Sequence, residues 1–114
     1  MKDDIRVILA DNNVQDRESK KRLLNEQGIQ VVYETGDGKK ALENIKKLKP
    51  DVVVMDMILP GVDGLEILEE CREFTEYKPL FIIATALRRE GLIEQALAQG
   101  ANYYMMKPLS ATML

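Results

Sequence analysis

Residues 52–64 read Val-Val-Val-Met-Asp-Met-Ile-Leu-Pro-Gly-Val-Asp-Gly, and the apolar run at the start of this stretch ends abruptly at Asp56. Four consecutive apolar residues are typical of a strand that is buried on both faces of a sheet. The sequence therefore predicts a carboxylate at the carboxyl end of a buried strand. Because ligands of open α/β sheets bind at that edge, Asp56 is the first candidate for chemistry.

On either side of this stretch, strand-like runs alternate with segments of helical periodicity. We expect strands at about residues 5–10, 29–33, 52–55, 80–84 and 102–106, and helices at about 14–27, 41–48, 63–74 and 88–99. This alternation, with its short loops, predicts a parallel sheet that is covered by helices on both faces. Right-handed crossovers then place the carboxyl ends of all five strands at one edge.

Two of the predicted helices differ in how well their apolar stripes are defined. Helix 88–99 has a clear stripe, in which we expect four inward residues: Leu92, Ile93, Ala96 and Leu97. Helix 14–27 has a thin stripe made of Val14, Leu23 and Leu24. The lysine pairs that begin at Lys20 and Lys39 are interpreted as solvated faces. Gly28 and Gly100 are expected at the C-terminal caps of these two helices.

Size and composition exclude several classes of function. The 114 residues are enough for one domain, and a net charge of −3 argues against direct nucleic-acid binding by this chain. With no histidine and one cysteine, Cys71, zinc sites, disulfides and histidine-based catalytic triads are excluded. The charged N-terminus and the lack of a membrane-length apolar run lead us to expect a soluble cytoplasmic protein with no membrane partner.

Polar residues follow the ends of four predicted strands. They are Asp11 with Asn12, Asp56, Thr85 and Lys107. These positions are far apart in the sequence, but a parallel sheet with its carboxyl ends at one edge should bring them together.

This set of residues resembles the receiver domain of bacterial two-component response regulators. The resemblance rests on the polar positions above, on Lys107-Pro108 and on the turn at residues 59–64, and it covers essentially the whole chain. It implies a flavodoxin-like, doubly wound α/β fold with five parallel strands in the order 2-1-3-4-5. Within the family, residues 10–12 and 100–104 most resemble the sporulation-initiation type, in which a receiver is joined to a DNA-binding domain.

The resemblance also implies a chemical role for each residue. Asp56 would be the phosphoacceptor, and Mg²⁺ (or Mn²⁺) would be held by Asp11, Asn12, Asp56 and the backbone carbonyl of Ile58. Lys107 would place its charge on one phosphoryl oxygen, and Thr85 would offer its hydroxyl to another. Such a protein assists its own phosphorylation and is not a turnover enzyme.

Two features depart from the usual pattern or bear on how long the phosphate lasts. Asn12 stands where the family usually has a second Asp, so we expect weaker Mg²⁺ binding and slower phosphorylation. Ile58 and Leu87, two residues beyond Asp56 and Thr85, are apolar and cannot hydrogen-bond an attacking water. We therefore expect slow hydrolysis of the aspartyl phosphate.

Transmission to partners is expected to use Thr85 and Tyr104 as a coupled switch. The output face would be helix 88–99 with the fifth strand, and the phosphate donor would be a histidine kinase or a phosphotransfer protein. A phosphorylation-linked dimer remains open. Because little chain follows Ser110, the expected N-cap of a last helix, we expect residues 1–114 to be one receiver domain that is truncated before its final helix and has no output domain.

Two other functions compete with a phosphorylated switch. A degenerate receiver could dock partners without being phosphorylated, and Asn12 and the largely missing last helix favour that reading. A phosphatase of the haloacid dehalogenase type would need a second Asp two residues after the nucleophile, where this chain has Ile58.

Overall fold

The computed structural model describes residues 4–74, 76–86 and 90–107. Five strands alternate with four helices along this part of the chain. The strands are β1 (Arg6–Ala10), β2 (Gln30–Thr35), β3 (Val52–Met55), β4 (Leu80–Thr85) and β5 (Tyr103–Met106), and the helices are α1 (Val14–Glu26), α2 (Gly38–Leu48), α3 (Gly64–Cys71) and α4 (Glu90–Ala98). The predicted alternation of strands and helices is confirmed, with ends that differ from the predicted ones by at most three residues.

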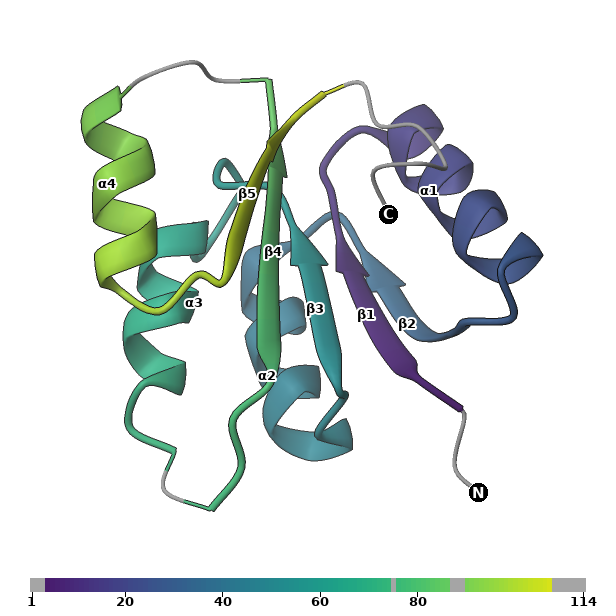
Figure 1. Ribbon diagram of the computed structural model, residues 1–114, viewed down its shortest axis with the longest axis horizontal. Coiled ribbons are helices and arrows are strands. Elements are labelled where there is room, and N and C mark those ends of the chain that lie inside the picture. The colour runs from purple at the N-terminus through teal and green to yellow at the C-terminus, as the bar shows by residue number, and fades with distance from the viewer. Residues whose placement is uncertain (1–3, 75, 87–89, 108–114) are drawn as a thin grey trace.

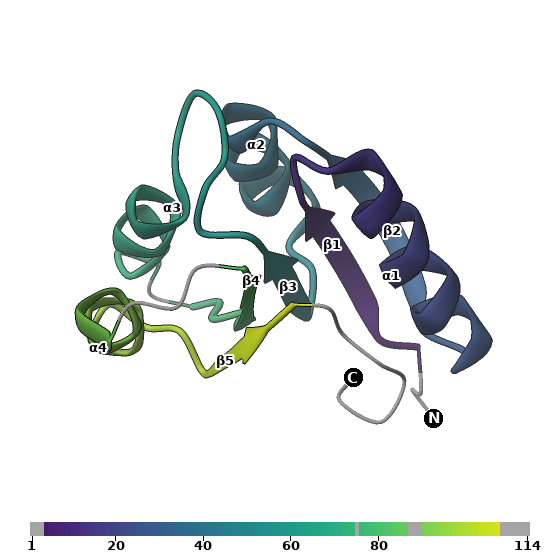
Figure 2. The same cartoon turned by 90° about the horizontal axis from the view of Figure 1, so that it is seen from above.

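The five strands form one parallel sheet in the order β2-β1-β3-β4-β5, as predicted. Their carboxyl ends lie together at the upper edge in Figure 1. Helix α1 lies on one face of the sheet, and α2, α3 and α4 lie on the other, which Figure 2 shows from above. The doubly wound α/β architecture is therefore confirmed, and it places the residues that follow β1, β3, β4 and β5 at one edge.

Each face of the sheet has its own apolar core. On the α1 side, Leu24 packs with inward residues of the sheet, which are Val7, Leu9, Val54 and Ala84. The other side holds the larger cluster, in which α2, α3 and α4 contribute Ala41, Ile45, Ile67, Leu68 and Ala96. The three central strands, β1, β3 and β4, are largely buried on both faces, and this explains why their sequences are mostly continuous apolar runs.

Local capping explains where the helices begin and end. Asn13 and Asp37 accept hydrogen bonds from the backbone N–H three residues on, and Asp63 forms a reciprocal capping box with Glu66. At the predicted C-terminal cap after α1, Gly28 has a φ of 81°, a backbone conformation in which glycine carries no steric penalty. Because Asp63 is its N-cap, α3 starts directly after the loop that follows β3.

Three expectations about individual side chains are wrong. Leu97, predicted to face inward, is 46% exposed, because the inward face of α4 is formed around the fully buried Ala96. Val14 is also exposed, and Lys20, predicted to be solvated, is buried. The two differences on α1 have the same cause. Polar contacts, as well as the packing of Leu24, decide which side of this helix faces the sheet. The expectations for Leu87, Arg88, Pro108 and Ser110 lie outside the described residues.

Candidate functional site at the carboxyl edge of the sheet

Asp56 follows β3 directly and is held at the centre of the edge. Its backbone N–H donates to the carbonyl of Ala10 at 2.9 Å, so the end of β3 stays paired with β1. The Asp56 side chain is 13% exposed, and its Oδ1 accepts a hydrogen bond of 3.2 Å from the N–H of Ile58. The carboxylate is thus oriented by its own loop but can still be reached from solvent.

Asp11 lies beside it, at the end of β1, and is almost fully buried. Its Oδ1 accepts a 2.9 Å hydrogen bond from the N–H of Asn13, and its Oδ2 lies 2.6 Å from Nζ of Lys20 and 2.9 Å from Nζ of Lys107. Burial works to raise the pKa of Asp11, but the hydrogen bonds from Lys20 and then Lys107 outweigh it and hold this pKa below the ordinary value of 3.8. Asp11 is therefore a stable carboxylate anion at neutral pH.

Lys107 follows β5 and connects the carboxylates. Its Nζ lies 2.8 Å from Oδ2 of Asp56, 2.9 Å from Oδ2 of Asp11 and 3.3 Å from Oδ2 of Asp16, while its backbone N–H donates to the carbonyl of Thr85 at 3.0 Å. Partial burial works to lower the pKa of Lys107, but the hydrogen bonds to Asp56 and Asp11 raise it above the ordinary 10.5. The ammonium is therefore charged over the whole physiological range.

The other predicted site residues lie on the same edge or next to it. Thr85 is the last residue of β4 and is buried, with Met106 of β5 as its neighbour in register. Asn12 is exposed between Asp11 and the start of α1. Tyr104 lies in β5 and is half-buried against the larger core. The structure thus brings Lys107 into direct contact with both Asp11 and Asp56, whereas the roles predicted for all these residues remain predictions.

Sequence reasoning missed two members of this cluster, Lys20 and Asp16. Both lie on the face of α1 that is turned to the sheet edge, at positions four residues apart on the helix. The sequence did contain an indication of this. Helix 14–27 has too few apolar residues to cover its face of the sheet, which indicates that polar residues at helical spacing also face the sheet.

Whether this arrangement suits a divalent cation can be judged from its donors. The carboxylate oxygens of Asp11 and Asp56 are of the hard type that Mg²⁺ prefers. However, the Oδ2 atoms of both already contact ammonium groups. Within the described residues, no group of three His, Cys, Asp or Glu side chains is arranged to hold a metal ion. The donors therefore fit Mg²⁺ in kind, but they are few and partly neutralised by lysines.

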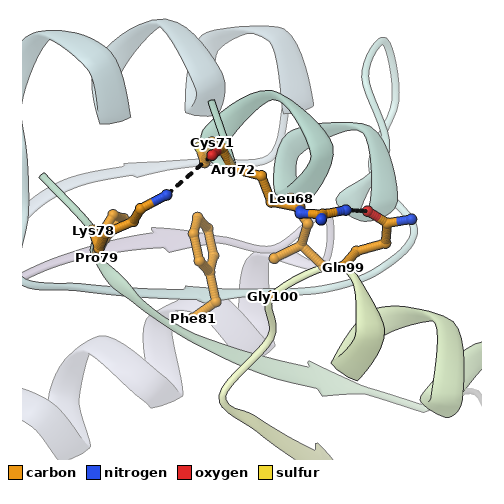
Figure 3. Close-up of a pocket in the computed structure, with 8 residues that line it drawn as sticks. All are labelled: Leu68, Cys71, Arg72, Lys78, Pro79, Phe81, Gln99 and Gly100. Carbon is orange, nitrogen blue, oxygen red and sulfur yellow. Dashed lines mark hydrogen bonds between the residues drawn. The ribbon is translucent and has the colours of Figure 1, made fainter. Parts of the chain in front are cut away.

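A separate cavity of about 110 Å³ lies at the opposite edge of the sheet, between the ends of α3 and α4 (Figure 3). Arg72 donates to Oε1 of Gln99 at 2.7 Å across it, and Phe81 projects into it from β4. Cys71 also lines this cavity, and burial raises the pKa of its thiol to about 12, so the thiol is inert. None of the predicted site residues lines this cavity.

Known proteins with similar sequences identify the family to which this chain belongs. Residues 7–114 match the family model described as the response regulator receiver domain, and the chain belongs to this family. It is 35% identical over 107 residues to protein-glutamate methylesterase/protein-glutamine glutaminase 1 of Methanospirillum hungatei. The matched segment covers 91% of this chain and 31% of that protein. It is 34% identical to the transcriptional regulatory protein PdtaR of Mycobacterium tuberculosis, covering 92% of this chain and 50% of PdtaR. The chain thus spans half or less of these two relatives.

Solved structures support the same assignment. The receiver domain of the response regulator NarL from M. tuberculosis has a TM-score of 0.91 at 33% identity, covering 97% of this chain and 90% of that one. CheY in the CheX–CheY–BeF₃–Mg²⁺ complex from Borrelia burgdorferi has a TM-score of 0.88 at 25% identity, covering 96% and 82%. The chain is therefore a response-regulator receiver domain, a class whose expected function is signalling by phosphorylation. No helix in the described part is long and apolar enough to cross a membrane.

Proposed function

We propose that this receiver domain is phosphorylated on Asp56 by a histidine kinase or a phosphotransfer protein. The observation that carries the proposal is the position of the Asp56 carboxylate, which is partly accessible at the carboxyl edge and lies 2.8 Å from the Lys107 ammonium. A carboxylate oxygen of Asp56 attacks phosphorus, a P–O bond forms, and the P–N bond of the phosphohistidine breaks, so that the electron pair leaves with the imidazole nitrogen.

In the proposed reaction, Lys107 changes its partner. Its ammonium leaves Oδ2 of Asp56 for a phosphoryl oxygen and keeps its contact with Asp11, so the charge that develops on the phosphoryl group is met by a cation already in place. Thr85, buried at the end of the neighbouring strand, offers its hydroxyl to a second phosphoryl oxygen. In this reaction the receiver domain is the acceptor of the phosphoryl group and not an enzyme that turns over a substrate.

Mg²⁺ is the cofactor that we propose, and the CheY complex among the structural neighbours contains it. The residues that would hold it are Asp11, Asn12, Asp56 and the backbone carbonyl of Ile58. When bound, it would supply positive charge to the oxygens of the carboxylate and the phosphoryl group.

The proposed output uses the neighbouring strand and helix. Tyr104 in β5 is half-buried, and Thr85 lies at the end of β4, the strand that pairs with β5. A phosphoryl group that draws Thr85 toward it would leave room for Tyr104 to turn inward, and so change the surface formed by α4 and β5. We propose this surface as the binding face for an output domain or a partner protein.

A second candidate function is docking without phosphorylation. It is favoured by the two lysines that already neutralise the carboxylates at the edge, because such a site is stable without phosphate or metal. In that case the α4–β5 surface would bind its partner constitutively.

Incubation with phosphoramidate or acetyl phosphate and Mg²⁺, followed by intact-mass measurement, tests the proposal. We expect the mass of one phosphoryl group to be added to the wild-type protein and none to be added to Asp56→Asn, which keeps the shape of the side chain. No addition to the wild type would favour the docking module. Multiple turnover of phosphate esters would instead indicate a phosphatase.

A further inference from the structure

Lys20 is a buried lysine in the middle of α1. Its side chain is only 4% exposed, and its Nζ lies 2.6 Å from Oδ2 of Asp11. Lysines are rarely buried to this degree unless they are paired, because desolvating an ammonium is costly. The adjacent Lys21 behaves differently, since it is half-exposed and pairs with Glu34 on β2. Lys20 therefore belongs to the site at the sheet edge, and Lys21 does not.

The charges at this edge are nearly balanced by the protein itself. Three carboxylates, those of Asp11, Asp16 and Asp56, surround the ammonium of Lys107, and Lys20 adds a second ammonium on Asp11. Oδ2 of Asp11 thus contacts two cations at once. A divalent cation that approaches Asp11 must share this carboxylate with Lys20 or displace it, and a buried ammonium a few ångströms away repels it strongly.

We propose that Lys20 is a built-in cation that sets how tightly the site binds divalent metal. In the metal-free protein it neutralises Asp11 and holds its carboxylate in place. When Mg²⁺ binds, Lys20 must give up part of its contact with Asp11, so that it weakens the affinity for Mg²⁺. This inference rests on the metal site that is part of the proposed function, but its test does not depend on phosphorylation.

The test is a calorimetric titration of the 114-residue chain with MgCl₂, in which Lys20→Met is compared with the wild type. Methionine keeps the length and the apolar stem of lysine but removes its charge. We expect Lys20→Met to bind Mg²⁺ at least about tenfold more tightly than the wild type, because a repelling charge has been removed. Lys21→Met is the matched control, since its ammonium lies on Glu34, and it should bind as the wild type does.

A second measurement uses the unmodified protein and remains valid if Lys20→Met fails to fold. The ¹³Cε resonance of Lys20 should shift as MgCl₂ is added, whereas that of Lys21 should not. Equal or weaker Mg²⁺ binding by a folded Lys20→Met, or a Lys20 resonance that is unmoved by Mg²⁺, would overturn the proposal. Failure of Asp56 to accept phosphate would instead contradict the proposed function and leave the Mg²⁺ comparison standing.

Discussion

The ammonium of Lys107 lies 2.8 Å from Oδ2 of Asp56, which ties the segment after β5 to the loop after β3 across the intervening strand β4. The same ammonium contacts Asp11, which follows β1. One side chain therefore connects three strand ends that are separated by tens of residues in the sequence. Loss of this charge should affect the chemistry at the edge more than the fold, because the strands are paired through their backbones and not through this side chain.

We expect Lys107→Met to slow phosphorylation of Asp56 by phosphoramidate by about a hundredfold, because one preorganised cation for the developing charge is lost. The rate can be followed by intact mass over time. Lys46→Met is a suitable control, since Lys46 pairs with the exposed Glu70, away from the edge. Equal rates for the wild type and Lys107→Met would contradict a role for Lys107 in phosphoryl transfer.

The convergence of Asp11, Asp56 and Lys107 could be predicted from sequence because it depends on topology alone. Each residue follows an apolar run that reads as a strand, and parallel strands joined by right-handed crossovers end at one edge. The exact side-chain partners did not have to be known. The two-sided covering of the sheet was likewise predictable from the alternation of strand and helix patterns. The strand order came instead from the resemblance to receiver domains, because the alternation alone does not determine it.

The role of Lys20 was not predictable in the same way. A lysine in a helix with a thin apolar stripe is usually solvated. Burial of Lys20 is favourable here because its ammonium donates a hydrogen bond to Asp11 at the end of β1. Gly38 is a similar case: it is the first residue of α2 and lacks a positive φ, so its backbone conformation does not require glycine. What requires glycine there is the close approach of Val62 from the loop after β3, a contact distant in sequence.

Gly38→Ala should destabilise the fold and disturb the loop next to Asp56. A Cβ at position 38 would lie 1.6 Å from the carbonyl oxygen of Val62, so backbone must move. We expect the free energy of unfolding in urea to fall by about 2 kcal/mol or more. Gly91→Ala is the matched control, because a Cβ there meets nothing within 4 Å and alanine favours the helix by up to about 1 kcal/mol. Equal effects of the two substitutions would contradict the close-packing argument.

Glu34 should make the stability of the fold depend on acid pH. Hydrogen bonding from Lys21 is the largest influence on its pKa and, with the weaker contribution of Arg17, outweighs burial, so this pKa lies below its ordinary 4.5. A carboxyl group with a lowered pKa stabilises the folded state above its unfolded pKa, and this contribution is lost as the pH falls through the folded value.

Glu34→Gln should therefore be slightly less stable than the wild type above pH 4.5, and the difference should disappear as the pH falls through the lowered pKa of Glu34 in the folded protein. Urea unfolding of both proteins at a series of pH values between neutral and acid measures this directly. A difference that stays constant over the whole series would show that Glu34 titrates alike in the folded and unfolded chains.

Asn12→Asp should tighten Mg²⁺ binding, because it adds a carboxylate next to Asp11 at an exposed position where no burial cost opposes the charge. We expect a decrease in Kd of about tenfold, measured by calorimetric titration, and a faster reaction with phosphoramidate. Asn25→Asp, near the far end of α1, controls for the change in net charge. The same dissociation constant for the wild type and Asn12→Asp would refute this expectation.

Ile58→Glu should shorten the lifetime of the aspartyl phosphate. The Ile58 side chain is 54% exposed and its N–H donates to Oδ1 of Asp56, so a side chain at this position lies beside the proposed phosphoryl group but as isoleucine cannot orient water. A carboxylate there can accept a proton from an attacking water, and we expect hydrolysis to be at least about tenfold faster. The half-life is read by intact mass after removal of the phosphodonor, with Ile58→Leu as the apolar control. An unchanged half-life for Ile58→Glu would mean that water reaches the phosphorus by a route on which residue 58 has no influence.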